Sequence, residues 1–238
     1  VPSSLVGSVQ DIISGQVNVF TGTNPLDLPD PETARTRTAG VVWQFDPGTG
    51  GFTNTTLSLD YYRINIRDFI DTPTGQESLD LCYVLADPTA CGGIVRIGGA
   101  LTVSGTGVPA FITNFDFFRS EGLQFGLRTG YELEDWGSLS FSMNANLYLT
   151  NEFQTTAVSD LIDCKGRYGT SCDPVPKWRH TARLSWNKDE FDASMLWRRI
   201  GSMSIQENER QFIFPDFQSI GAFNYFDFSA GFQVTEQV

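Results

Sequence analysis

The segment from Ser138 to Thr150 alternates apolar and polar side chains at nearly every step. A period of two predicts a β-strand with one dry face and one wet face, and this strand is longer than the usual five or six residues or so. Its polar parity carries small uncharged groups, where a soluble protein would normally show charges. The apolar parity consists of Leu139, Phe141, Met143, Ala145, Leu147 and Leu149.

The same alternation recurs along the chain and predicts further strands. It is found in residues 39–45, 123–133, 178–186, 191–198 and 226–234. The segment 57–66 departs from it, because its apolar positions change parity after Tyr61. A β-bulge at Tyr61 and Tyr62 would explain the change, and so would a strand that leaves its apolar surroundings there. Both explanations remain open from the sequence.

The connections between these strands alternate in length. Residues 46–51, 134–137 and 187–190 are short and rich in turn-forming residues, whereas roughly 71–108, 154–176 and 204–222 are long. Outer-membrane barrels have short periplasmic turns and long external loops. The pattern therefore predicts an all-β fold, an antiparallel up-and-down transmembrane β-barrel segment of about seven to eight strands whose apolar parity faces lipid.

Aromatic side chains lie near the expected strand ends. Trp178 and Trp186 share a face, and at about 3.3 Å per residue they lie about 26 Å apart along the strand. A tilt near 40° reduces this to roughly 20 Å of height, close to the apolar band of such barrels. His180 lies on the same parity and suits an interfacial position. The predicted membrane girdle is Trp43, Trp136, Trp178, Trp186 and Trp197.

Composition limits the classes of function. Only 18% of the 238 residues are charged, and the formal net charge of −12 disfavours binding to nucleic acid. No apolar run of about 18 residues predicts a transmembrane helix. The chain starts at Val1 without a leader pattern, so we expect either a removed leader or an internal fragment.

The cysteines form two close pairs inside long connections. Cys82 is near Cys91, and Cys164 is near Cys172. Neither pair has zinc-site spacing and His180 is the only histidine, so we expect no metal and no cofactor. The spacing predicts two local disulfides made in an oxidising compartment; four free thiols in a cytoplasmic fragment are the alternative.

Two segments resemble the C-terminal half of a TonB-dependent outer-membrane receptor. In NPLDLPDPETARTRTAGVVWQF the matching residues are Asn24, Pro25, Leu28, Pro31, Glu32 and Thr33, with Asp30 as a small departure in spacing. In LSLDYYRINIRDFI they are Asp60, Tyr61 and Tyr62. SEGLQFGLRTGYEL and WGSLSFSMNANLYLT are similar to the family's later hairpins, so the resemblance runs from about Asn24 to the end.

This resemblance implies a barrel of about 22 strands closed around an N-terminal plug. It implies a place in the outer membrane of a Gram-negative bacterium, with lipid around the barrel and extracellular loops. A scarce nutrient, such as a ferric siderophore, cobalamin or an oligosaccharide, would bind the loops and plug. An inner-membrane TonB energy complex would drive its uptake. Residues 1–238 are then expected to be a partial barrel domain, with the plug and final strands outside them.

Charged residues on the polar parity are predicted to face the lumen. They would form cross-strand ion pairs, or contact the plug or guide an anionic ligand. These residues are Arg128, Arg179, Arg183, Asp192, Arg198 and Asp227. Residues of the long loops that combine reach with polarity are candidates for ligand contact. They are Tyr83, Arg167, Tyr168, Glu207, Glu209 and Arg210.

Other classes of protein remain as alternatives. A passive porin or autotransporter barrel would share the strand pattern. A soluble β-sandwich that binds carbohydrate would use its exposed aromatic residues as sugar platforms. An outer-membrane enzyme would need a nucleophile and a base together, and no Ser/His/Asp arrangement can be recognised from spacing, so we expect no enzyme.

Overall fold

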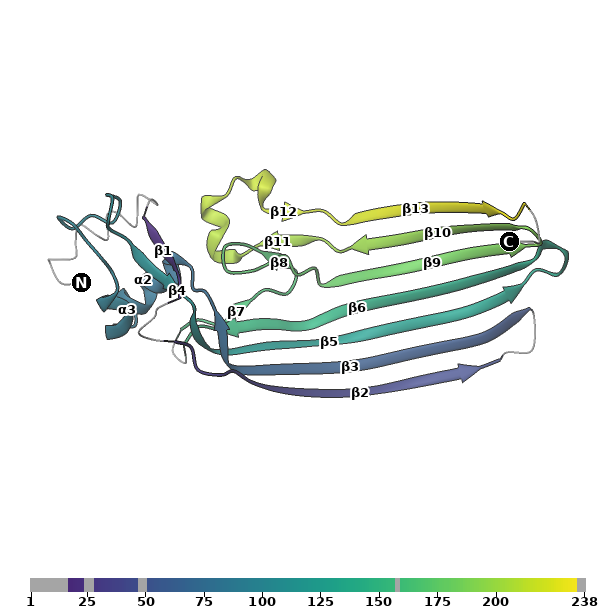
Figure 1. Cartoon of the computed structure of the whole chain (residues 1–238), viewed down its shortest axis with the longest axis horizontal. Coiled ribbons are helices and arrows are strands. Elements are labelled where there is room, and N and C mark those ends of the chain that lie inside the picture. The colour runs from purple at the N-terminus through teal and green to yellow at the C-terminus, as the bar shows by residue number, and fades with distance from the viewer. Residues whose placement is uncertain (1–16, 24–27, 47–50, 157–158, 235–238) are drawn as a thin grey trace. The chain divides into compact units, whose positions relative to one another are not determined.

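The computed structural model describes residues 17–23, 28–46, 51–156 and 159–234. Its long strands form one open sheet in the order β13-β10-β9-β6-β5-β3-β2, and the short β7 pairs with β6 beside this path (Figure 1). Neighbours in the sheet are also consecutive long strands in the chain, so the predicted up-and-down segment is confirmed. The strands are β2 (Thr33–Phe45), β3 (Phe52–Asp71), β5 (Thr113–Glu132), β6 (Ser138–Gln154), β7 (Ile162–Asp163), β9 (Trp178–Lys188), β10 (Phe191–Ile200) and β13 (Phe223–Phe232).

The chain divides into two compact units, which are described separately. The first contains residues 1–35, 65–118 and 152–162, and the second contains residues 36–64, 119–151 and 163–238. The second unit includes the whole of β9, β10 and β13 and the candidate site described below.

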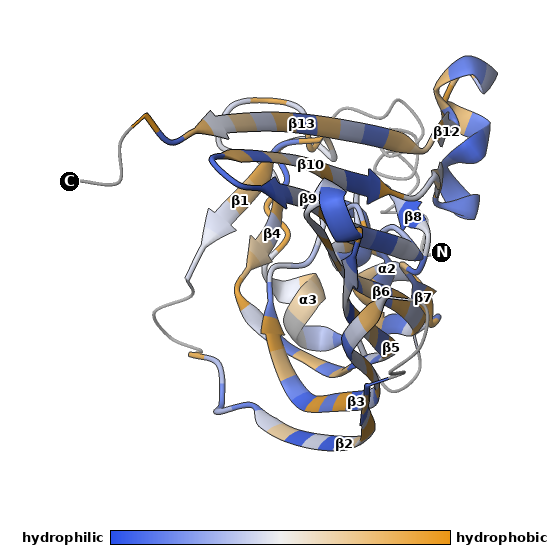
Figure 2. Ribbon diagram, turned by 90° about the vertical axis from the view of Figure 1, so that its right-hand side faces the viewer, coloured by the Kyte–Doolittle hydropathy of each residue, from blue (hydrophilic) through white to orange (hydrophobic). Residues whose placement is uncertain are grey.

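Strand register in the second unit keeps the two parities on opposite faces. One row across β6, β9, β10 and β13 is entirely serine, and the adjacent row is entirely apolar. Figure 2 shows the alternation as blue and orange bands along β2 and β3. The serine row is Ser140, Ser185, Ser194 and Ser229, and the apolar row is Phe141, Leu184, Met195 and Phe228.

The apolar face is not sealed in a core. Phe228 is 75% exposed and Leu184 is 38% exposed, and no second layer of sheet covers this row within the described residues. A β-sandwich would bury such a face between two sheets. The sandwich alternative is therefore wrong, and a face of this kind requires an apolar solvent.

β3 shows that no bulge lies at Tyr61 and Tyr62. Thr55 is hydrogen-bonded to Thr129 of β5, and Arg63 forms an ion pair with Glu121. The interval from Thr55 to Arg63 on β3 has the same number of residues as the interval from Glu121 to Thr129 on β5, whereas a bulge would add one residue to one of the two strands. The parity change instead lies in the sequence, because after Tyr61 the parity that carried apolar residues carries Arg63, Asn65 and Arg67.

Two short connections close as predicted. The 3₁₀ turn η2 (Glu134–Trp136) joins β5 to β6 and ends at Gly137, whose φ of +83° favours glycine. Asp189 has a φ of 48° in the β9–β10 turn. Residues 47–50 of the third predicted turn, and Asn24 and Pro25, lie outside the described residues.

The first long connection folds as part of the first unit and contains helices that the strand pattern did not predict. β1 (Val19–Gly22) pairs in parallel with β4 (Val108–Phe111), and α2 (Gly75–Tyr83) and α3 (Pro88–Gly92) lie between them in the chain. Thr74 and Glu77 form a capping box at the start of α2. The local core is Leu79, Leu101 and Val108. Within the described residues, no helix is long and apolar enough to cross a membrane.

Candidate functional site

The polar face of the sheet in the second unit is hollowed into a depression of about 740 Å³. β3, β5, β6, β9, β10 and β13 all contribute to its lining. Side-chain amides, hydroxyls and guanidinium groups line it together with apolar atoms, so the depression offers hydrogen-bonding groups to water or a polar solute. Its polar-face residues include Ser58, Asp60, Gln124, Asn144, Asn146, Arg179, Arg198 and Tyr225.

Glycines make room for neighbouring side chains on the polar face. A Cβ on Gly126 would lie 2.5 Å from the Ser58 Oγ, and one on Gly122 would lie 2.5 Å from the Tyr62 hydroxyl oxygen. Neighbouring side chains therefore lean over glycine positions on the polar face. Glycine inside a strand often marks a place where another group approaches closely, as it does here.

The predicted lumen charges lie on this polar face. Arg198 donates to Asp227 at 2.9 Å, but both side chains are about half exposed, so the pair contributes only about 0–1 kcal/mol. Arg183 donates to the Ser194 hydroxyl at 2.9 Å, and Ser194 shares a hydrogen bond with Ser229. The face is thus connected mainly by mixed polar contacts.

The remaining predicted charges have different surroundings. Arg179 lies over the Tyr148 ring, 6.0 Å from its centroid. Asp192 is beside Gly231, where a Cβ would collide with its carboxylate. Arg128 is exposed. Within the described part of the chain, Arg198 with Asp227 is the one ion pair among the predicted lumen charges.

The long connections on either side of β9 and β10 are joined into one structure. β8 (Arg167–Tyr168), β11 (Met203–Ile205) and β12 (Ser219–Ile220) form a three-stranded sheet in the order β12-β11-β8. The 3₁₀ turns η3 (Glu207–Phe212) and η4 (Pro215–Phe217) complete it. We call residues 163–176 and 201–222 together the loop platform.

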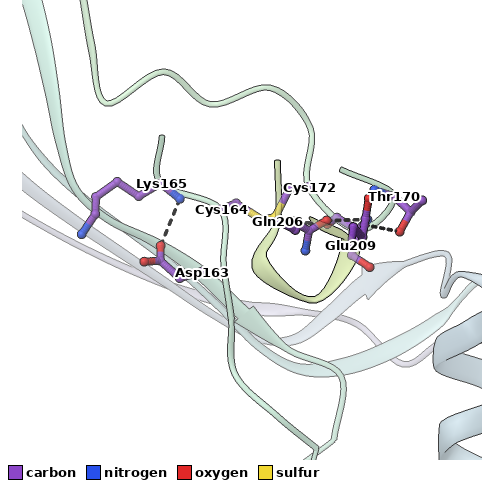
Figure 3. The surroundings of a disulfide bond; sticks show 8 residues. Asp163, Cys164, Lys165, Thr170, Cys172, Gln206 and Glu209 are labelled. Atoms are coloured by element: carbon purple, nitrogen blue, oxygen red, sulfur yellow. Dashed lines mark hydrogen bonds between the residues drawn. A yellow bond between two sulfur atoms is a disulfide. The ribbon is translucent and has the colours of Figure 1, made fainter. Parts of the chain in front are cut away.

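Side chains connect the two halves of the loop platform beside the Cys164–Cys172 disulfide (Figure 3). The Glu209 Oε1 accepts from the Thr170 backbone N–H at 2.8 Å and from its hydroxyl at 2.6 Å. The Gln206 Oε1 accepts from the Ser171 backbone N–H at 3.1 Å. These contacts hold the two connections in one arrangement.

Predicted ligand residues take part in the same network. Arg167 lies 3.7 Å from Glu207, and the Tyr168 hydroxyl donates to the Phe217 carbonyl. The Arg210 carbonyl accepts from the Gln218 side chain at 2.9 Å. The structure therefore brings Arg167, Tyr168, Glu207, Glu209 and Arg210 together in the loop platform.

Tyr83 belongs to the first unit. Its hydroxyl accepts from Arg96, whose guanidinium also lies 5.5 Å from the Tyr83 ring centroid. The Cys82–Cys91 disulfide joins α2 to α3 in the same connection. Both predicted cysteine pairings are confirmed, and the described chain has no free cysteine.

Sequence reasoning missed the exposed phenylalanines of the loop platform. Phe212, Phe214 and Phe217 are 77%, 79% and 69% exposed. It also missed Gln206, which is only 4% exposed and connects the two halves. The run QFIFPDF could have indicated the aromatic surface, because it places several phenylalanines in a proline-containing loop rather than in an alternating strand.

Tryptophans gather at both ends of the strands, on the apolar face. At the short-turn end, the Trp186 indole N–H donates to the Trp136 carbonyl at 2.8 Å, and Trp43 contacts Phe45 with ring centroids 4.7 Å apart. At the loop end, the Trp178 indole N–H donates to the His180 Nδ1 at 2.8 Å.

The loop-end group extends to the next strand. The His180 ring packs edge-on against Trp197, with centroids 4.3 Å apart. Aromatic residues at both ends of an apolar strand face are typical of membrane–water interfaces. The predicted girdle residues thus lie near the two ends of the apolar strand face, and their place at a membrane interface stays a prediction.

A family model described as "TonB dependent receptor-like, beta-barrel" matches residues 4–238. The chain belongs to the TonB-dependent receptor family. This family is one of transport receptors of the outer membrane rather than a class of enzymes. No group of His, Cys, Asp and Glu able to hold a metal ion occurs in the described ranges.

Solved structures of TonB-dependent receptors resemble the chain. A ferric enterobactin receptor (PfeA) mutant from Pseudomonas aeruginosa shares the fold: it is 13% identical, with a TM-score of 0.53, and the match covers 86% of this chain and 24% of that one. The siderophore receptor PirA from Acinetobacter baumannii is 14% identical, with a TM-score of 0.49, over 87% of this chain and 26% of that one. The chain thus spans about a quarter of their length. No curated protein matches it.

Loss of the Cys164–Cys172 disulfide is expected to loosen the loop platform. In the full-length receptor, C164S/C172S should lower the stability of this region by about 2–3 kcal/mol, because the unfolded connection is no longer constrained. Limited proteolysis of intact cells would measure it as faster cleavage within residues 163–176. This stabilising role would be contradicted if the variant were cleaved no faster than the wild type under non-reducing conditions and if reduction left the cleavage rate of the wild type unchanged.

Proposed function

We propose that this chain forms part of the wall of an outer-membrane receptor that imports a scarce nutrient with energy from a TonB complex. The nutrient belongs to the ferric siderophore, cobalamin or oligosaccharide class. The receptor's own plug domain is the partner of the polar face, and membrane lipid surrounds the apolar face. The chain has no enzymatic role and uses no resident cofactor.

The observation that carries the proposal is the two-faced sheet with unequal ends. Its apolar face is exposed, whereas its polar face is hollowed and hydrogen-bonded. A wide barrel needs this arrangement, with lipid outside and water or a plug inside. Seven long strands alone are too few to close such a lumen.

The ends of the sheet support an orientation. Short turns follow β5 and β9, whereas the opposite ends carry the disulfide-containing connections. Disulfides form outside the reducing cytoplasm, and barrels of this kind place long loops at the cell surface. We therefore assign the loop platform to the extracellular side, where it meets the nutrient first.

The loop platform is the favoured ligand surface in the second unit. Exposed Phe212, Phe214 and Phe217 lie on a network of ordered polar contacts, so little conformational entropy is lost when a ligand binds. Arg210 offers a guanidinium group, whereas the charge of Arg167 is balanced by Glu207 at 3.7 Å. A passive porin would not need an external surface of this kind.

Uptake by cells that express the full-length receptor tests the proposal. A receptor-deletion strain is complemented with the wild-type gene and given labelled ferric siderophores, cobalamin and oligosaccharides separately. One class should accumulate at least tenfold above the deletion strain, and accumulation should vanish without the TonB complex. Accumulation that persists without the energy complex would identify a passive porin and overturn the proposal.

A further inference from the structure

On several strands, an arginine lies on the apolar face at the loop end of the apolar stretch. On β2, Arg37 precedes Ala39 on the same parity, and on β3, Arg63 follows Tyr61. On β10, Arg199 follows Trp197. These positions lie toward the loop end of each strand. We call Arg37, Arg63 and Arg199 the arginine collar.

Strand register places two collar arginines side by side. A Cβ on Gly40 would lie 1.9 Å from a carboxylate oxygen of Asp60, so these two residues face each other across β2 and β3. Counting along antiparallel strands from this pair sets Arg37 opposite Arg63. Like charges directly opposite each other are destabilising unless an anion lies between or beside them.

Only one arginine of this pair contacts a carboxylate in the described part of the chain. The Arg63 Nε lies 3.0 Å from the Glu121 Oε1 of β5, whose side chain is 17% exposed. Arg37 is exposed and has no carboxylate partner among the described residues. The row Arg37–Arg63–Glu121 therefore carries a surplus positive charge.

Arg199 is a second cation without a carboxylate partner in the described chain. Its register partners are His180 and Asn224. The Arg199 Nη1 donates to the Asn224 Oδ1 at 3.2 Å, and the same oxygen accepts from the Trp197 indole N–H at 3.0 Å. Arg199 thus lies directly beside the loop-end aromatic group, at the expected edge of the apolar band.

We propose that the arginine collar binds the phosphate groups of lipids in the leaflet around the loop ends. The chain as a whole has a net charge of −12, whereas the arginine collar carries a surplus of positive charge at one end of the lipid-facing surface. This local surplus calls for an external anion. Guanidinium groups bind phosphate in a bidentate manner, and their stems lie along apolar surfaces. The inference rests on the proposed function, because that function assigns this surface to lipid and these ends to the outer leaflet.

Lipid retention by the purified full-length receptor tests this site. Receptor in detergent is mixed with bisphosphorylated lipid A, or with dephosphorylated lipid A as the matched probe, and bound lipid is counted by native mass spectrometry. The wild type should prefer the phosphorylated lipid. R37Q/R199Q should weaken its binding by about 25-fold, because each arginine near an anionic lipid surface contributes about fivefold. Arg63 is left in place because its loss would leave Glu121 unpaired.

The control variant R128Q/R183Q removes the same charge from the opposite, polar face. It should retain phosphorylated lipid as the wild type does. Equal loss in both double variants, or no preference between the two lipids, overturns the collar proposal. Energy-dependent uptake is measured in the same strains: intact uptake with unaltered lipid retention in R37Q/R199Q refutes the collar alone, whereas wild-type uptake without energy dependence refutes the proposed function.

Discussion

Replacing Met143 by arginine in the full-length receptor is expected to lower the free energy of unfolding from a bilayer by about 2–4 kcal/mol. Met143 lies on the apolar face of β6, opposite Ala182 of β9 and between Phe141 and Ala145. A charge there must enter hydrocarbon or distort the bilayer to reach water. Urea titration of the receptor in lipid vesicles, followed by the fraction that remains folded, would measure the loss.

Ser140 provides the matched control for this prediction. It lies on the same strand but on the polar face, opposite Ser185. Ser140→Arg places the same side chain in the lumen, where water reaches it, so the change should stay within about 1 kcal/mol. If Ser140→Arg and Met143→Arg were equally harmful, the two faces would not meet different solvents, and the transmembrane interpretation of the sheet would be wrong.

Gly122→Ala is expected to be the most damaging single-methyl change in the sheet, at about 1–3 kcal/mol. An added Cβ would lie 2.5 Å from the Tyr62 hydroxyl oxygen and 2.7 Å from the Leu147 carbonyl oxygen. The second contact is with backbone of β6, which cannot move without disturbing the strand pairing. The same vesicle titration would report the lost stability.

Gly221 is a suitable control, since no atom lies within 4 Å of the place that an added Cβ would take and its φ is not in the left-handed region. Gly221→Ala should therefore change stability by less than about 0.5 kcal/mol. A loss at Gly122 no larger than at Gly221 would show that β5 and β6 do not pack as closely as the structure has them.

Local features of the fold were predictable from sequence because each depends on near neighbours. Alternation from Leu139 to Leu149 determines which side chains share a face of β6 whatever the strand pairs with. The short spacing of Cys164 and Cys172 limits the possible partners of each. The family resemblance extended these local patterns to a barrel.

Other features depended on pairing between distant segments. The α2 and α3 helices occupy a connection with no alternation to guide a prediction, and they are held by a disulfide and a small core. The two explanations of the parity change after Tyr61 could be separated only when the Thr55–Thr129 and Arg63–Glu121 pairs set the register.

The candidate site shows the same division. The sequence placed Arg198 and Asp227 on polar parities, but only the pairing of β10 with β13 put them within 2.9 Å of each other. Glu209 was a ligand candidate by its position in a loop, and the structure shows its carboxylate bonded to Thr170. Sequence could not predict this bond, because the two residues are brought together by separate connections.

The amino-acid sequence by itself determined the two-faced strands, the unequal connections, the disulfide pairs and the aromatic ends, since each is encoded over a few residues. The tertiary structure alone decided the hollow on the polar face, the joining of the loop platform and the neighbouring positions of Arg37 and Arg63. The physical reason is register. Hydrogen bonding between strands sets which distant residues become neighbours, and the periodicity within one strand carries no information about that choice.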